Sequence, residues 1–235
     1  MAGTHRAVVT GAGRGLGLEF TRQLLARGGD VVAACRRPGE ARALTALAVA
    51  HPGHLHVLPL DVASERSRLA FARALAGLHD GLELLVNNAG VLPSGERFGQ
   101  LQGAQLEQTL AINAIGPLLL TQALAPLLAR GQRPRVANLS SAWGSMARLD
   151  EFRTPSYAIS KAALNMASVL MARALNPQGI GVLTLSPGWV RTDMGGERAP
   201  LTPRESVQDL LALIDRRPGL PAGEFLDHHG EPLPW

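Results

Sequence analysis

The chain has 235 residues, of which 46% are hydrophobic and 18% are charged, and its formal net charge at pH 7 is +4. This length and apolar content are typical of one domain with a large buried core. Basic residues are dispersed, with no run longer than a pair such as Arg36-Arg37, which argues against nucleic-acid binding. The single cysteine, Cys35, excludes an internal disulfide and suits a reducing compartment. The sequence starts directly in a strand pattern and has no apolar run approaching about 20 residues, so we expect a cytoplasmic protein without membrane contact.

Short runs rich in Val and Leu alternate with longer segments of helical period along the whole chain. This rhythm is typical of βαβ units around a parallel sheet. We therefore predict an α/β fold with a doubly wound parallel β-sheet and helices on both faces, in which residues 1–235 form a single domain. The predicted strands occupy 6–10, 30–35, 54–62, 82–90, 135–141, 179–188 and 223–228. The predicted helices occupy 15–28, 39–50, 64–77, 104–129, 156–176 and 203–215.

A glycine-rich turn, TGAGRGLG (10–17), lies between the first predicted strand and the first predicted helix. Its glycines, at every second position from Gly11 to Gly17, permit a tight turn and close approach of a pyrophosphate. The N-terminus of the following helix favours that negative charge. The strand–turn–helix context predicts a dinucleotide site rather than a plain structural turn.

The end of the second strand distinguishes the two nicotinamide cofactors. An NAD site usually carries a carboxylate there to hold the ribose hydroxyls, whereas this chain has Cys35, Arg36 and Arg37. Arg36 offers a charge-assisted fork for a 2′-phosphate, and Arg14 in the glycine turn is placed to reach the same phosphate. We expect NADP as the cofactor, with NADPH preferred over NADH; exposed arginines without a ligand are the alternative.

Polar residues also follow the third and fourth strands, at the edge where parallel sheets bind ligands. We expect Asp61 to accept a hydrogen bond from the adenine amino group and Asn87 to fix the neighbouring backbone. The NNAG sequence (87–90) is equally good turn chemistry, so a structural role is the alternative.

In the long helix, Asn113 lies four residues before Pro117, which has no N–H to donate to the Asn113 carbonyl. This carbonyl is predicted to hold a water on a proton path, or else the proline marks only a kink. Strand five then ends near three candidate hydroxyls, those of Ser140, Ser141 and Ser145.

The segment TPSYAISK contains the only tyrosine and the only lysine of the chain, Tyr157 and Lys161. Their i, i+4 spacing places them on one face of a helix. The pKa of tyrosine is ordinarily about 10, too high for efficient proton transfer near neutrality. We expect Lys161, together with a cationic nicotinamide, to lower it. Since arginine supplies every other basic side chain, this lysine indicates a catalytic pair rather than an ordinary helix pair.

In their order, these motifs resemble the short-chain dehydrogenase/reductase family, which has a single-domain Rossmann fold. The resemblance spans essentially the whole chain through TGAGRGLG, Asp61-Val62, NNAG, Asn113, Ser141, Tyr157-x-x-x-Lys161 and PGWVRT (187–192). SSAWGS, SKAALNMA, PGWVRTDMGG and the Pro-Trp ending look most like the C-factor and sniffer-type carbonyl reductase group. The resemblance implies four catalytic residues, Asn113, Ser141, Tyr157 and Lys161, with Ser140 and Ser145 as alternatives to Ser141. It implies cofactor contacts from Gly11, Gly13, Arg14, Gly15, Leu16, Gly17, Arg36, Arg37, Asp61, Val62, Asn88, Ala89, Gly90, Tyr157, Lys161, Pro187, Gly188, Val190 and Thr192.

The activity implied is NADPH-dependent reduction of an aldehyde or ketone to an alcohol, by reversible hydride transfer, in a homodimer or homotetramer. The alternative is a C-factor-like nucleotide-binding signalling protein with little metabolic turnover. Trp143, Trp189 and Met194 are candidate walls of the substrate pocket or ordinary packing residues, and 190–203 is predicted to be a mobile loop over the site. We expect His228 and His229 to point to opposite sides of the last strand, and so no metal site.

Overall fold

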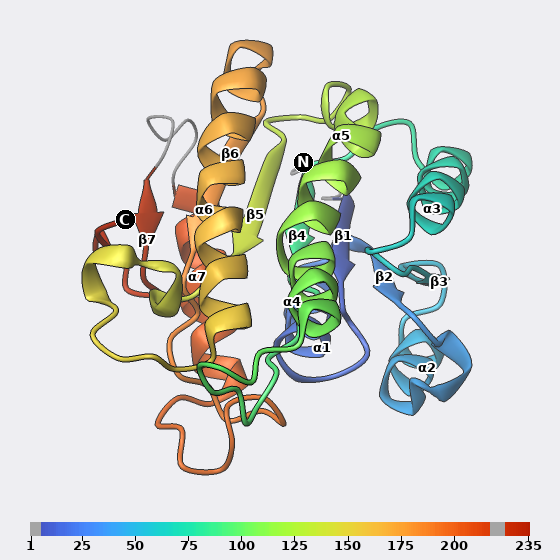
Figure 1. Ribbon diagram of the computed structural model, residues 1–235. Coiled ribbons are helices and arrows are strands. Elements are labelled where there is room, and N and C mark those ends of the chain that lie inside the picture. Colours follow the sequence, from blue (N-terminus) through green and yellow to red (C-terminus); the bar gives the residue numbers. More distant parts are fainter. Residues whose placement is uncertain (1–5, 217–223) are drawn as a thin grey trace.

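The computed structural model describes residues 6–216 and 224–235. Its strands are β1 (Arg6–Thr10), β2 (Asp30–Cys35), β3 (Leu55–Pro59), β4 (Leu84–Asn87), β5 (Arg135–Leu139), β6 (Gly181–Leu185) and β7 (Phe225–Leu226). They form one parallel sheet in the order β3-β2-β1-β4-β5-β6-β7 (Figure 1). The strand order reverses direction between β1 and β4, which is where open sheets of this kind bind ligands. The predicted fold class is confirmed.

Helices cover both faces of the sheet. They are α1 (Gly15–Ala26), α2 (Arg42–Ala50), α3 (Glu65–Leu78), α4 (Gly103–Leu110), α5 (Gly116–Leu128), α6 (Pro155–Leu175) and α7 (Pro203–Arg216). Figure 1 shows α4, α5 and α6 in front of the sheet and α1 and α7 behind it. Along β1, Ala7 and Val9 join the core under α1 and α7, while Val8 joins the core under α3, α5 and α6. Because both faces are buried, the strands are apolar at consecutive positions rather than at alternate ones.

The helix predicted over 104–129 is interrupted. A π-helical turn, Ala111–Ile115, separates α4 from α5, and Gly116 donates its N–H to the Ala111 carbonyl five residues earlier. Pro117 therefore lies in the first turn of α5, where a missing N–H is tolerated. By length and composition alone, Gly103–Leu128 could cross a membrane, as could core helices of many soluble proteins. Here α5 packs on β4, β5 and α6.

The expectation for the adjacent histidines is wrong. Strand β7 ends at Leu226, so His228 and His229 lie in a turn, where side chains do not alternate between two faces. Their ring centroids are 3.9 Å apart.

Candidate cofactor and catalytic site

A cavity of about 470 Å³ opens at the carboxyl edge of the sheet. Three predicted cofactor residues do not line it. Gly17 packs beneath the glycine turn, Gly188 packs against Leu201 and His228, and Val190 is buried beside Leu201. The other predicted cofactor residues form much of the wall: Gly11, Gly13, Arg14, Gly15, Leu16, Arg36, Arg37, Asp61, Val62, Asn88, Ala89, Gly90, Tyr157, Lys161, Pro187 and Thr192.

The glycine turn is locked against the loop after β4. Gly11 has a φ of 65°, and a Cβ placed on it would lie 2.8 Å from the Ala89 Cα. Asn88 Nδ2 donates to the Thr10 carbonyl at 2.8 Å, and Thr10 Oγ1 accepts from the Asn88 and Ala89 N–H groups at 3.0 Å each. A side chain at Gly11 would therefore push the glycine turn and the loop after β4 apart.

Asn88, and not Asn87, holds this backbone. The Asn87 amide is buried and donates to Asn138 Oδ1 at 2.8 Å and to Thr121 Oγ1 at 3.1 Å. The prediction for Asn87 is wrong because its side chain points into the polar layer between β4, β5 and α5, while Asn88 faces the glycine turn.

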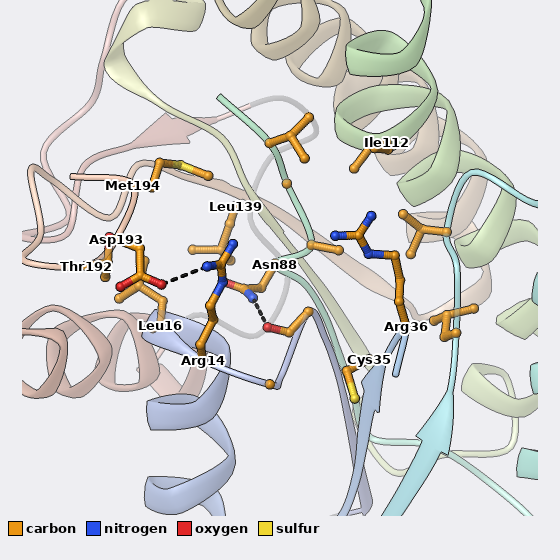
Figure 2. A pocket seen from close by; sticks show the side chains of 18 of the residues that line it. Arg14, Leu16, Cys35, Arg36, Asn88, Ile112, Leu139, Thr192, Asp193 and Met194 are labelled. Carbon is orange, nitrogen blue, oxygen red and sulfur yellow. Dashed lines mark hydrogen bonds and ion pairs between the residues drawn. The ribbon is translucent and has the colours of Figure 1, made fainter. Parts of the chain in front are cut away.

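Two arginines face the cavity from different sides, Arg14 from the glycine turn and Arg36 from the end of β2 (Figure 2). Arg14 Nη1 lies 2.7 Å from Asp193 Oδ2, in an ion pair whose side chains are 78% and 73% exposed. Such an exposed pair contributes only about 0–1 kcal/mol, so a bound phosphate can compete for Arg14. Arg37 pairs with Glu40 at 3.1 Å. Within 6–216 and 224–235, Arg36 has no carboxylate partner.

Tyr157 and Lys161 share one face of α6, as predicted. Their side chains are almost fully buried at 8% and 5% exposure, and Lys161 Nζ lies 5.5 Å from the centre of the tyrosine ring. The ammonium donates to the Leu139 carbonyl at 2.6 Å. A Cβ placed on Gly90 would lie 3.4 Å from Asn113 Oδ1 and 3.9 Å from Lys161 Nζ, so these groups converge at one end of the cavity.

The electrostatics of this pair differ from the expectation. Burial raises the pKa of Tyr157 to about 12, although a hydrogen bond with Ser141 acts in the opposite direction. Burial also lowers the pKa of Lys161 to about 8. In the chain without a nicotinamide, the pKa of Tyr157 is therefore raised and not lowered, because desolvation outweighs the hydrogen bond with Ser141.

The environments of the three candidate serines differ. Ser141 is hydrogen bonded to Tyr157, and its Oγ also accepts from the Trp143 N–H at 3.2 Å. Ser140 lines the cavity, but its hydroxyl donates to Asn165 Oδ1 at 2.5 Å. Ser145 is buried outside the cavity wall. Ser141 does not line the cavity, but of the three serines it is the one hydrogen bonded to the tyrosine hydroxyl.

The Asn113 side chain joins the π-helical turn to the loop after β4. Its Oδ1 accepts from the Val91 N–H at 2.9 Å, and its Nδ2 donates to the Val91 carbonyl and to Ser160 Oγ at 2.9 Å each. The amide is thus fully committed to structure, and only the main-chain carbonyl is left for the predicted water.

Glu96 fixes the start of α6, and the sequence analysis missed it. Its carboxylate accepts from the Ser156 N–H at 3.2 Å and from the Ser156 hydroxyl. Just before the helix, Thr154 has a φ of 42°, a strained conformation for a β-branched residue. A carboxylate at a helix N-terminus is stabilising, so Glu96 holds the turn that carries Tyr157.

The predicted aromatic wall is partly formed. Trp143 packs edge-on against Tyr157 with ring centroids 6.0 Å apart, and Met194 lines the cavity. Trp189 is exposed and donates its indole N–H to the Gly195 carbonyl at 2.8 Å, within the loop predicted over 190–203. Further wall residues were not singled out from the sequence: Cys35, Glu40, Ala41, Leu60, Val91, Ile112, Leu139 and Asp193.

Residues 5–201 match the family model described as short chain dehydrogenase. The chain belongs to the short-chain dehydrogenase family. The C-signal protein of Myxococcus xanthus is 41% identical over 154 residues, which are 66% of this chain and 93% of that relative. The NADPH-bound carbonyl reductase from chicken fatty liver is 34% identical and superposes with a TM-score of 0.93 over 99% of both chains. The carbonyl reductase Sniffer of D. melanogaster is 31% identical with a TM-score of 0.93, over 99% of this chain and 100% of that one.

In this short-chain dehydrogenase, three of the further wall residues could have been predicted from the positions of the strands. Cys35, Leu60 and Leu139 each lie at or next to the carboxyl end of a parallel strand, where ligands bind. No local signal identifies Ile112 or Asp193. They reach the cavity only because the π-helical turn and the loop after β6 fold over it.

Proposed function

We propose that this protein is an NADPH-dependent carbonyl reductase that converts an aldehyde or ketone to an alcohol. One observation carries the proposal: the buried Tyr157 and Lys161 line the same cavity as the glycine turn and Arg36, which has no carboxylate partner in the described part of the chain, and Ser141 is hydrogen bonded to Tyr157. Similarity to the NADPH-bound chicken enzyme and to Sniffer supports it.

The residues present fit the cofactor. The glycine turn at the start of α1 lines the cavity and suits a pyrophosphate. Arg36 suits a 2′-phosphate because the end of β2 has no carboxylate to repel it. Asp61 lines the same cavity and is exposed, as an acceptor for an adenine amino group requires. When bound, the nicotinamide supplies a hydride to the carbonyl carbon.

Tyr157 then gives its hydroxyl proton to the carbonyl oxygen, and the Ser141 hydroxyl donates a second hydrogen bond to that oxygen as negative charge develops there. Lys161 holds the cofactor ribose and keeps positive charge near the tyrosine. We further propose that the tyrosine is reprotonated through Lys161 and a water on the Asn113 carbonyl.

The pKa of Tyr157 suits a proton donor near neutral pH. With a pKa of about 12, Tyr157 is protonated and ready to act as an acid.

The test is a panel of aldehydes, ketones and alcohols followed at the nicotinamide absorbance with NADPH and NADH. Turnover of carbonyl compounds with a preference for NADPH is expected. A preference for NADH would contradict the role of Arg36, and no turnover of any carbonyl compound would contradict the proposed activity.

A signalling role with little turnover is the second candidate, and the similarity to C-signal favours it. A protein that only binds nucleotide has no need of a buried tyrosine hydroxyl beside a buried ammonium. NADPH binding without reduction across the whole panel would support signalling instead.

We also propose that the protein is a homo-oligomer assembled through α5 and α6. Both helices expose large apolar side chains, including Leu118 on α5 and Ile159, Met166 and Leu170 on α6. Light scattering of the wild type and of Met166→Glu would test this, because an oligomer through this face should dissociate in the variant. Cytoplasmic localisation stays a prediction from the sequence, supported by the lone Cys35.

A further inference from the structure

A second group of metal-binding side chains lies outside the cofactor cavity, between α7 and the turn after β7. Asp209, His228 and His229 each present a ligand atom there, and all three atoms lie within 4.8 Å of one another. Within 6–216 and 224–235 this is the one such group of histidine, cysteine and carboxylate side chains.

The turn itself holds the two imidazoles together. Asp227 Oδ1 accepts from the N–H groups of His229 and Glu231 at 2.9 Å each, and Gly230, with a φ of 88°, donates to the Asp227 carbonyl at 3.1 Å. Asp227 Oδ1 is therefore occupied by hydrogen bonds within the turn. The planes of the two histidine rings are tilted by 38° to each other.

The three donors are not committed to other partners. In the described part of the chain, the Asp209 carboxylate makes no hydrogen bond or ion pair although it is only half exposed. His228 Nδ1 is buried and has no hydrogen-bond partner among these same residues.

We propose that Asp209, His228 and His229 bind a late first-row divalent metal ion such as Zn²⁺. Two imidazoles and one carboxylate form a ligand set that zinc accepts, with water in the fourth position, whereas Mg²⁺ and Ca²⁺ prefer oxygen ligands. Tetrahedral bonds of about 2.0–2.1 Å hold ligand atoms about 3.4 Å apart, so modest side-chain rotations complete the site.

The metal would link α7 to the turn after β7, which packs against residues 187–192. A Cβ placed on Gly188 would lie 3.2 Å from the ring of His228, so the imidazole packs directly on the backbone of PGWVRT (187–192). The site is separate from the cavity, because none of its three residues lines the cavity wall.

The experiment is calorimetric titration of the full chain, prepared without a polyhistidine tag, with ZnCl₂, and absorption spectroscopy with Co²⁺ as a second probe. One Zn²⁺ per chain is expected. Asp209→Asn and His229→Ala should each weaken binding by more than about tenfold, since loss of even an outer-shell partner costs about 10–100-fold.

His54→Ala is the matched control, because it removes an exposed imidazole that lies 2.6 Å from Asp30 but belongs to no group of three. This variant should bind zinc like the wild type. Absence of zinc binding by the folded wild type would overturn the proposal, as would equal affinity in Asp209→Asn and His229→Ala. Circular dichroism of each variant shows whether it is folded. If either is not, the Co²⁺ spectrum of the wild type decides, since the four-coordinate site proposed here gives intense d–d bands and a six-coordinate, mostly hydrated ion does not.

Discussion

Polar side chains at the two ends of the parallel strands differ in how fully they are paired within the chain. The amino ends form the amino edge of the sheet, and the carboxyl ends form its carboxyl edge. At the amino edge, the Glu83 carboxylate accepts from Arg6 Nη2 at 2.6 Å, from Arg6 Nε and N–H at 2.9 Å each, and from the Gln132 N–H at 3.0 Å. At the carboxyl edge, Arg36 has no ion-pair partner in the described part of the chain, and the Tyr157 hydroxyl has only Ser141.

The pKa values follow this difference. Burial alone would raise the pKa of Glu83, but the hydrogen bonds from Arg6 and Gln132 lower it to about 2. For Tyr157 burial prevails, and the pKa rises to about 12. Polar groups satisfied within the chain stabilise the fold, whereas groups left partly unsatisfied beside a cavity are those available to a ligand.

Removal of the tyrosine hydroxyl should have the largest effect. Tyr157→Phe is expected to lower kcat for carbonyl reduction by about 10²–10⁴-fold, because it removes the proton donor while leaving the buried ring in place. NADPH binding, followed by fluorescence titration, should change little. Near-wild-type turnover of this variant would contradict the assignment of Tyr157 as the acid.

A substitution at the amino edge should change the stability of the fold rather than turnover. Glu83→Gln is expected to lower the free energy of unfolding by about 1–3 kcal/mol, since it weakens charge-assisted hydrogen bonds in a partly buried ion pair. The folded-state pKa of Glu83 is below its ordinary value of 4.5, so its contribution is complete above pH 4.5 and is lost as pH falls toward 2. Urea unfolding at several pH values measures this loss, which the variant should lack. Glu107→Gln, at an exposed helix position, is the control and should be neutral.

Loss of the ammonium should reduce turnover less than loss of the hydroxyl. Lys161→Met is expected to lower kcat/KM by about 10–100-fold, which corresponds to a hydrogen bond to a charged group. In the wild type, kcat/KM for reduction should fall above about pH 8 as Lys161 loses its proton. A pH profile that stays flat from 7 to about 9.5 would argue against this role.

The smallest effect is expected for cofactor choice. Arg36→Gln should raise the KM for NADPH by about tenfold and leave the KM for NADH unchanged, because only NADPH has the 2′-phosphate. Arg42→Gln removes a nearby exposed arginine outside the cavity wall and should change neither value. Equal changes for both cofactors in Arg36→Gln would show that Arg36 does not read the phosphate.

Local patterns predicted much of this molecule. Buried strands are continuous apolar runs, and the spacing of Tyr157 and Lys161 is that of one helix face, so both are visible in the sequence. Contacts between distant segments are not: Arg14 meets Asp193 across 179 residues, and Ser156 meets Glu96 across 60. The sign of the Tyr157 shift was also out of reach, because it depends on how completely the fold excludes water.

The most direct test of the carboxyl-edge site follows the transferred hydrogen. NADPH labelled with deuterium at C4, in each of the two stereochemical forms, is incubated with the protein and a carbonyl substrate that it reduces, and the alcohol is analysed by mass spectrometry. The account predicts deuterium at the carbinol carbon from one of the two forms only. An alcohol without deuterium from either form would contradict it.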